Sequence, residues 1–327
     1  MNHYHRWLSG LLLFTCSSIF AGDRVALVIG IDRYDHLPKD AQLSVAVSDA
    51  KLIADTLKTL NPPFSVRLLT DVSQRDAMES LTNFVDEAND AECALVYFAG
   101  HGVEYHGSNF LLARDTRVTN VSPDIERMKR RLSLSALPLQ AIVDEMDGTK
   151  AQVKVVVLDA CRNNPLKAVN STGSRSAFGK TRGLAQVSPP TGTLIAFSAD
   201  AGQQANDGLF TRILSANLKI TGIPLPHVFA MTREEVRAEA IALEKDNQGV
   251  FHEPAEYTKL NLAGMKFSFS SATEENSPVP TREKLADSKV GGEVAKTKLH
   301  RISNSRFQGY KPEKVPDYYI LYYTASW

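Results

Sequence analysis

Two apolar stretches of the sequence end in residues that could carry out nucleophilic catalysis. The stretch YFAGHG (97–102) ends with a histidine between two glycines, and VVVLDACRNNP (155–165) contains a cysteine where its apolar run stops. A cysteine nucleophile needs a base to form its thiolate and N–H donors to hold the oxyanion. His101 could be the base for Cys161, and the backbone N–H groups of Gly102 and Cys161 could form the oxyanion hole.

The elements that must position these residues are predicted from hydrophobic patterns. Short apolar runs typical of buried strands lie at 24–31, 64–70, 93–100, 153–160 and 192–199. Helical spacing of apolar residues lies at 43–60, after a cap at Ser73 and Asp76, and at 136–147, 209–219 and 228–244. This alternation predicts an α/β fold, with a mostly parallel central sheet and helices on both faces.

In parallel sheets, functional groups collect at the carboxyl ends of the strands. His101 and Cys161 both follow such ends, so they would converge if their strands are neighbours. Cys93 begins its strand instead, which puts it roughly 20 Å or more from that edge. A disulfide between Cys93 and Cys161 is therefore not expected, and Cys161 would be a free thiol.

Taken together, several motifs resemble a known family. ALVIGIDRYDHLP, ALVYFAGHGVEYHGSNFLLARD, VVVLDACRNNP, RGLAQV and GTLIAFSADAGQQANDGLFTRIL are similar to stretches of the bacterial caspase-like cysteine peptidases, relatives of metacaspases and paracaspases. The resemblance covers roughly residues 23–268. It implies a caspase-hemoglobinase fold and a His101–Cys161 dyad in a cysteine-type endopeptidase. Cys161 would attack the scissile carbonyl, and His101 would protonate the leaving amine and later activate water.

The resemblance also implies cleavage after Arg or Lys, through acidic residues at Asp49 and Asp159. Strand alternation points Asp159 to the same side as Cys161, where it could pair with a substrate guanidinium. The alternatives are a buried carboxylate that holds a loop for Asp159, and a helix N-terminal carboxylate for Asp49.

Other parts of the substrate pocket follow from position along the motifs. Some relatives carry a third acid where this chain has Gln204, and Asp200 or Asp207 could substitute for it. Ser198 and Ala199, at the end of a predicted strand, are expected to line the pocket wall.

The segment 165–191, rich in Gly, Ser, Pro and basic residues, is predicted to be a long exposed loop. It separates a large portion of the catalytic domain, ending near residue 165, from a small portion at 192–270. In the resembled family this linker is often the place of self-cleavage. The candidate sites are Lys167, Arg175, Lys180 and Arg182, for which the alternative is a set of solvated loop charges.

The two ends of the chain differ from the middle. Residues 1–21 have a basic start, a short apolar run and small residues at the end, which predicts a secretory signal peptide. Export to the periplasm or the extracellular space would follow, with an uncleaved membrane anchor as the alternative. Residues 271–312 are poor in apolar residues and are predicted to be a disordered linker. The aromatic segment 313–327 could add a strand to a partner.

Composition narrows the class of ligand. Lys plus Arg and Asp plus Glu are both 37, so no overall charge points to nucleic acid. Peptide or protein substrates are expected, without a cofactor, because no dense acidic loop predicts calcium and no paired ligand spacing around His101, His106 and Cys161 predicts zinc. A phosphatase would need Arg at the position of Lys167. The remaining alternative is a caspase-fold scaffold that binds peptides or envelope partners without catalysis.

Overall fold

The computed structural model describes residues 23–117, 124–161, 184–200, 205–246, 249–250, 252–271, 300–303 and 306–309. The chain forms two compact units, Met1–Ser271 and Ala272–Trp327. The described part of the second unit is a pair of antiparallel strands, β9 (His300–Ser303) and β10 (Arg306–Gly309). This strand pair lies inside the segment 271–312 that the composition predicted to be a linker.

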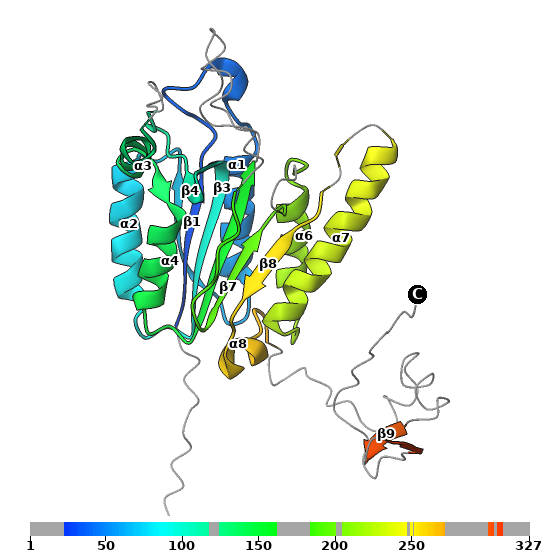
Figure 1. Cartoon of the computed structure of the whole chain (residues 1–327). Helices are drawn as coiled ribbons and strands as arrows, with labels where there is room; N and C mark the ends of the chain where they lie inside the picture. The colour runs from blue at the N-terminus through cyan, green and yellow to red at the C-terminus, as the bar shows by residue number, and fades with distance from the viewer. Residues whose placement is uncertain are drawn as a thin grey trace, which may run out of the picture. The chain divides into compact units, whose positions relative to one another are not determined.

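The first unit is built on one main sheet (Figure 1). Its strands lie in the order β2-β1-β3-β6-β7-β8, and all neighbours are parallel except β7 and β8. The strands are β1 (Arg24–Gly30), β2 (Ser65–Thr70), β3 (Cys93–Tyr105), β6 (Val153–Cys161), β7 (Thr193–Phe197) and β8 (Ala255–Thr258). The predicted fold class, a mostly parallel sheet with helices on both faces, is confirmed.

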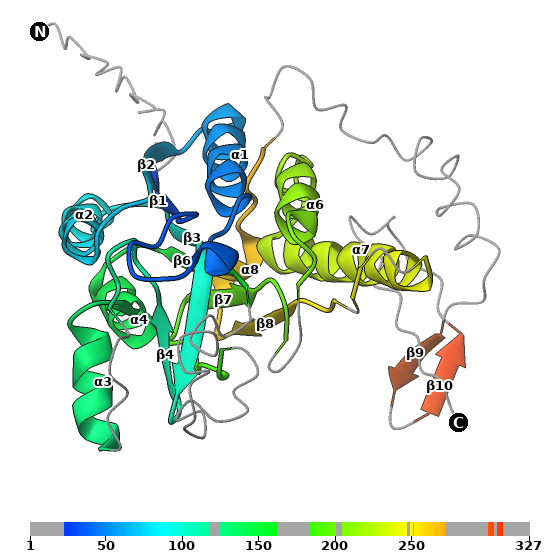
Figure 2. The ribbon, with the colours of Figure 1, turned by 90° about the horizontal axis from the view of Figure 1, so that it is seen from above.

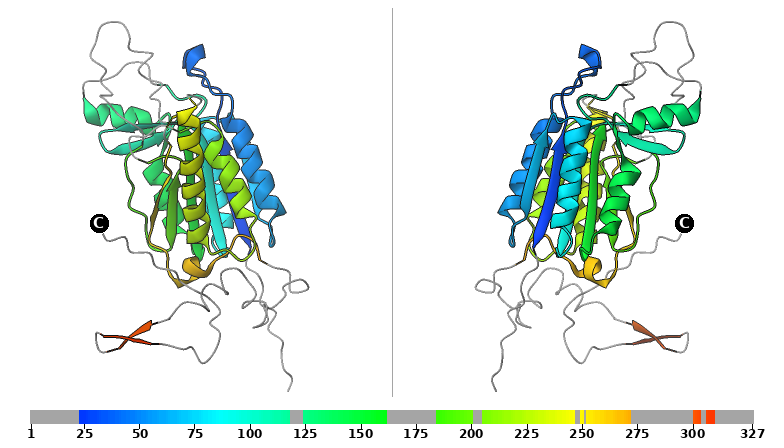
Figure 3. Two further views of the ribbon diagram at one scale, coloured as in Figure 1. Left: turned by 90° about the vertical axis from the view of Figure 1, so that its right-hand side faces the viewer. Right: turned by 90° about the vertical axis from the view of Figure 1, so that its left-hand side faces the viewer.

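Helices cover both faces of this sheet (Figures 2 and 3). On one face lie α1 (Ala46–Thr59), α6 (Leu209–Leu218) and α7 (Leu225–Lys245). On the other lie α2 (Gln74–Glu87) and α4 (Leu139–Gly148). The smaller elements are η1 (Lys39–Ala41), β4 (Ser108–Leu111), α3 (Ile125–Ser133), β5 (Leu137–Pro138) and α8 (Leu262–Lys266). Among the described helices, none is both long and apolar enough to cross a membrane.

Two hydrophobic cores, one on each face, explain why the strands read as continuous apolar runs. Every residue of β1 and β7 is buried, as expected for strands covered on both sides. Helix α2 buries Ala77, Leu81 and Phe84 at three- and four-residue spacing, and the Ser73 hydroxyl accepts the backbone N–H of Asp76, which confirms the predicted cap. Strand β2 is less buried than predicted, because it lies at the edge of the sheet.

The sequence patterns missed three features near the functional edge. Strand β3 does not stop at Gly100 but continues to Tyr105 and pairs with β4 in antiparallel fashion. Strand β8 closes the sheet in antiparallel orientation. Helix α3 was not predicted, although its sequence places Ile125, Met128 and Leu132 at three- and four-residue spacing. Of the loop predicted at 165–191, residues 184–191 are described and form no helix or strand, but Leu184 is buried rather than exposed.

Candidate active site

The two residues expected to act together lie side by side at the ends of neighbouring strands. Strands β3 and β6 pair in parallel, and their ladder ends with His101 opposite Cys161. Strands paired in this way are about 4.8 Å apart. Cys93 lies opposite Val153 at the far end of the same ladder, roughly 26 Å away at the rise of a parallel strand. Cys93 is a buried free cysteine, so it has no disulfide partner.

His101 is held by Tyr34 and Ala41 and is only 4% exposed. Its backbone N–H donates to the Tyr34 hydroxyl at 2.8 Å, and the two rings lie 4.8 Å apart. Its Nε2 lies 2.8 Å from the carbonyl oxygen of Ala41. Its Nδ1 is buried and has no hydrogen-bond partner among the described residues. Within the part of the chain that the structure describes, only Nε2 of this ring has a hydrogen-bond partner.

These contacts set the proton position on the ring. A carbonyl oxygen can only accept, so Nε2 carries a hydrogen and donates it to Ala41. In the neutral imidazole, Nδ1 then has a free lone pair. Burial lowers the pKa of His101, although the hydrogen bond to the Ala41 carbonyl works in the opposite direction. The ring is therefore poised as a neutral base with its accepting nitrogen uncommitted.

The loop that presents Tyr34 and Ala41 is fixed by one glutamine side chain. The Gln42 carbonyl oxygen accepts the backbone N–H of Tyr34 at 2.7 Å. The Gln42 amide nitrogen donates to the carbonyls of Tyr34 and Leu37, each at 3.0 Å. Residues 34–42 are thereby closed into a ring that includes η1, and the Ala41 carbonyl is held toward the histidine.

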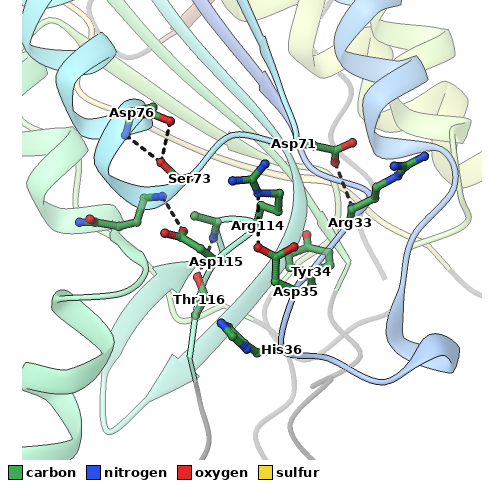
Figure 4. Close-up of polar contacts among 12 residues, drawn as sticks. Arg33, Tyr34, Asp35, His36, Asp71, Ser73, Asp76, Arg114, Asp115 and Thr116 are labelled. Atoms are coloured by element: carbon green, nitrogen blue, oxygen red, sulfur yellow. Dashed lines mark hydrogen bonds and ion pairs between the residues drawn. The ribbon is translucent and has the colours of Figure 1, made fainter.

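Polar contacts tie the start of this loop to two neighbouring loops (Figure 4). The Asp71 carboxylate accepts the backbone N–H of Arg33 at 2.9 Å, and Asp35 pairs with Arg114 at 3.5 Å. The backbone of Asp35 also donates to the Arg114 carbonyl at 2.8 Å. Tyr34 lies between these ties, so its position against His101 is determined by contacts on both sides.

The glycines that flank His101 make room for the protein's own side chains. Gly100 has a φ of 155°, and a β-carbon there would lie 2.9 Å from the Tyr34 hydroxyl. A β-carbon on Gly102 would lie 2.9 Å from Leu184. The space beside these glycines is filled by Tyr34 and Leu184, whose proximity only the folded chain reveals.

An acidic pocket opens beside this edge on the α1 and α6 face of the sheet. Asp49 from α1, Asp159 from β6 and Asp207 before α6 line it, together with Ala99 and Gly100. The described lining residues include no basic side chain. The free volume is about 10 Å³, enough for about one water molecule. A larger guest would need the pocket to widen.

The fold holds the carboxyl groups of this pocket close together, although they repel one another when charged. Burial raises the pKa of Asp49 to about 7, and the nearby Asp159, Asp207 and Asp32 carboxylates add to the rise. Burial also raises the pKa of Asp159, while the Thr211 and Ser198 hydroxyls oppose that shift. The Thr211 hydroxyl donates to Asp159 at 2.6 Å. Such mutual repulsion would be relieved by a cation.

A second buried histidine, His252, contacts Asn206, which lines the acidic pocket. The N–H of Asn206 donates to His252 Nδ1 at 3.2 Å, and His252 Nε2 lies 2.5 Å from the Ser198 carbonyl. The Asn206 side chain pairs with both backbone groups of Val250 at 2.8 Å. Gly208, which also lines the pocket, has a φ of 69°, so the chain turns from Asp207 directly into α6.

The other predicted pocket residues lie elsewhere. Ser198 and Ala199 are buried and are not among the residues that line the acidic pocket. Asp200 accepts a hydrogen bond from Tyr257 at 3.2 Å and does not line it either, so Asp207 is the better candidate for the third acid. The remaining sites lie outside the described residues: Gln204, Lys167, Arg175, Lys180 and Arg182.

Sequence reasoning missed several residues of the site. Tyr34 lies inside a motif that carried the family resemblance, so its role could have been suspected. The Ala41 carbonyl is a backbone group and leaves no trace in residue type. His252 and Gln42 are single polar residues whose partners lie far away or in an irregular loop. In the described residues, no group of three His, Cys, Asp or Glu is arranged to hold a metal ion.

Comparisons with known proteins agree with this fold. The family model described as Caspase domain matches residues 23–261. The chain therefore belongs to the Caspase domain family, a cysteine peptidase family.

Two curated relatives are the human mucosa-associated lymphoid tissue lymphoma translocation protein 1 and its mouse homolog. The human protein is 28% identical over 148 residues, which is 45% of this chain and 16% of the relative. The mouse homolog is 29% identical over 142 residues, covering 43% and 15% of the two chains. The chain thus spans about a sixth of the length of these relatives.

Solved caspase structures share the fold at low sequence identity. Caspase-1 from Spodoptera frugiperda is 16% identical, with a TM-score of 0.53 over 78% of this chain and 92% of that chain. The structure of pro-sf-caspase-1 is also 16% identical, with a TM-score of 0.52 over 78% and 94%.

Proposed function

We propose that this chain is a cysteine endopeptidase that cleaves after Arg or Lys, with Cys161 as nucleophile and His101 as general base and acid. The observation that carries the proposal is the end of the β3–β6 ladder, where His101 stands opposite Cys161 beside a pocket lined by three carboxyls. The uncommitted Nδ1 of His101 is the atom that would accept the thiol proton.

In this mechanism the loop at 34–42 acts through the histidine. The Ala41 carbonyl fixes the tautomer, so that Nδ1 takes the proton from Cys161 and the thiolate attacks the scissile carbonyl. The Ala41 carbonyl also stabilises the imidazolium that forms. Nδ1–H then donates its proton to the leaving amine, and water hydrolyses the thioester with His101 again as base.

The backbone supports the proposed oxyanion hole. The His101 carbonyl accepts the N–H of Leu112 at 2.9 Å, so in a trans peptide the next N–H, of Gly102, points away from β4. Gly102 follows the last rung of the β3–β6 ladder, in which His101 is paired with Cys161. The N–H groups of Gly102 and Cys161 would together hold the oxyanion.

Substrate preference would come from Asp49, Asp159 and Asp207. A guanidinium or ammonium group entering this pocket would offset the repulsion among the carboxyls, and Arg could bind one carboxylate through two hydrogen bonds. Entry requires the pocket to widen from its present volume.

We also propose export through the predicted signal at 1–21, which N-terminal sequencing of protein from a periplasmic extract and from the medium would test.

The test uses fluorogenic peptides that end in Arg, Lys, citrulline or Asp, with reductant and with or without calcium. Citrulline is the matched control, because it has the shape of Arg without its charge. We expect release after Arg and Lys, little after citrulline or Asp, and none with Cys161→Ala. Equal rates on the Arg and Asp peptides would overturn the specificity. No cleavage of any peptide would favour the alternative of a peptide-binding scaffold.

A further inference from the structure

A chain of hydroxyl groups runs from the hydrophobic core on the α1 and α6 face to the acidic pocket. The phenol oxygen of Tyr97 lies 2.5 Å from the hydroxyl oxygen of Thr211, which donates to the Asp159 carboxylate at 2.6 Å. Tyr97 and Thr211 are fully buried, so their contact is shielded from water. Three separate elements meet here, because β3 carries Tyr97, α6 carries Thr211 and β6 carries Asp159.

The direction of these hydrogen bonds follows from the number of hydrogens available. A threonine hydroxyl has one hydrogen, and Thr211 donates it to Asp159. Thr211 must therefore accept the hydrogen of the Tyr97 phenol. Burial and the nearby Asp159 and Asp49 carboxylates raise the pKa of Tyr97 well above its usual value, so the phenol keeps that hydrogen. Both donors in the chain thus point toward Asp159.

The two carboxyl groups that line the pocket from α1 and β6 are held differently. One oxygen of Asp159 accepts the Thr211 hydroxyl, which fixes the orientation of that carboxylate. The Asp49 side chain accepts no hydrogen bond from any residue that the structure describes, and its pKa is shifted only by burial and by neighbouring carboxylates. Asp159 is therefore a fixed acceptor, whereas Asp49 can rotate to meet a bound side chain.

We infer that Tyr97 and Thr211 are positioning residues of the acidic pocket, which hold Asp159 as a fixed acceptor for the basic side chain of the substrate. The inference rests on the proposed function. An acceptor that is already oriented loses less rotational freedom when the side chain binds. Burial raises the pKa of Asp159 and the Thr211 hydroxyl lowers it, so the hydroxyl favours the charged form that attracts a cation.

Helices α1 and α6 carry a second pair of buried hydroxyls, which provides a matched control. The hydroxyl oxygens of Thr56 and Ser215 lie 2.7 Å apart, and Ser215 follows Thr211 by about one helical turn. Both residues are buried, and neither lines the acidic pocket. Thr56→Val therefore removes a buried hydroxyl of the same kind without changing the contacts of Asp159.

The test measures kcat and KM on the Arg and citrulline peptides for variants that nearly preserve side-chain volume. Thr211→Val should raise KM for the Arg peptide about tenfold, and Tyr97→Phe about threefold, because each removes a donor that supports a charged acceptor. The kcat on the Arg peptide and KM for the citrulline peptide should each change less than twofold. Thr211→Ser keeps the hydroxyl and should stay within twofold of wild type. Thr56→Val should lower the midpoint of urea unfolding and leave KM unchanged.

Tyr97→Phe keeps the test valid if Thr211→Val does not fold, which circular dichroism will show. An unchanged KM for the Arg peptide in both variants, or an equal rise in Thr56→Val, would overturn the positioning role and leave the proposed function standing. Equal rises in KM for the Arg and citrulline peptides would also overturn it, because they would indicate a general disturbance of the pocket. Failure of wild type to cleave the Arg peptide would overturn the proposed function, and this inference with it.

Discussion

Two buried histidines lie near the functional edge, and their surroundings differ at one atom. His252 has both ring nitrogens in hydrogen bonds, to the Asn206 N–H and the Ser198 carbonyl. His101 has one nitrogen bound to the Ala41 carbonyl and the other without a partner among the described residues. Both residues are buried histidines, so neither burial nor residue type distinguishes a structural histidine from a catalytic base. The uncommitted nitrogen marks the residue that can move a proton.

The largest effect is expected from removing the uncommitted nitrogen. His101→Ala should lower kcat on the Arg peptide by about 10³-fold, in the range of lost general acid–base catalysis. His252→Ala should leave kcat within a few-fold of wild type. Steady-state kinetics of the two variants, side by side, measures the contrast. A comparable loss of kcat in the His252 variant would show that the two histidines are not distinguished in the way proposed.

The pocket in front of His252 should control affinity for charge. Asp49→Asn should lower kcat/KM for the Arg peptide by about 30-fold, because a hydrogen bond between charged groups contributes roughly 2 kcal/mol. Turnover of the citrulline peptide should change much less. Asp200→Asn is the control, since Asp200 contacts Tyr257 and does not line the pocket. If both variants lose the same activity, the pocket assignment is wrong.

Replacing His252 should weaken the structure of the pocket without stopping catalysis. His252→Ala leaves the Asn206 N–H and the buried Ser198 carbonyl without these partners, which costs about 1–3 kcal/mol of unfolding free energy. KM for the Arg peptide should rise about fivefold. Urea unfolding and Michaelis–Menten kinetics measure the two quantities. An unchanged KM, with the stability loss present, would reduce His252 to a purely structural role.

The smallest effect is expected from pH. The Asp49 carboxyl has its pKa raised to about 7, so its charged fraction rises about threefold between pH 6.5 and pH 7.5. KM for the Arg peptide should therefore fall about threefold over that range, and KM for the citrulline peptide should not. A flat KM profile for the Arg peptide would contradict this role of Asp49.

The Asp49 carboxyl should also affect the stability of the protein in the absence of substrate. A raised pKa means that Asp49 contributes stability that is fully present below pH 3.8 and is lost as pH rises to about 7. Asp49→Asn should remove that part of the pH dependence of the unfolding free energy, which chemical denaturation at several pH values would measure. Parallel profiles for the variant and wild type would contradict it.

The sequence predicted the strands that carry His101 and Cys161 because buried parallel strands are long apolar runs that end abruptly. It also placed Asp49 and Asp159, through motifs that resemble a family. It could not place the Ala41 carbonyl, because a backbone group has no residue type. It left Asp200 and Asp207 as equal candidates, because which of them faces Asp49 depends on how the chain turns at Gly208.

The sequence by itself determined the fold class, the apolar strands of the sheet and the pair of residues suited to nucleophilic chemistry, because hydrophobic period and chain order are local properties. Tertiary structure decided what surrounds those residues. The loop at 34–42 fixes the proton on His101, and Leu184 reaches Gly102 from 82 positions along the chain. Such contacts join segments distant in sequence, and their strength comes from burial and geometry that exist only once the sheet has formed.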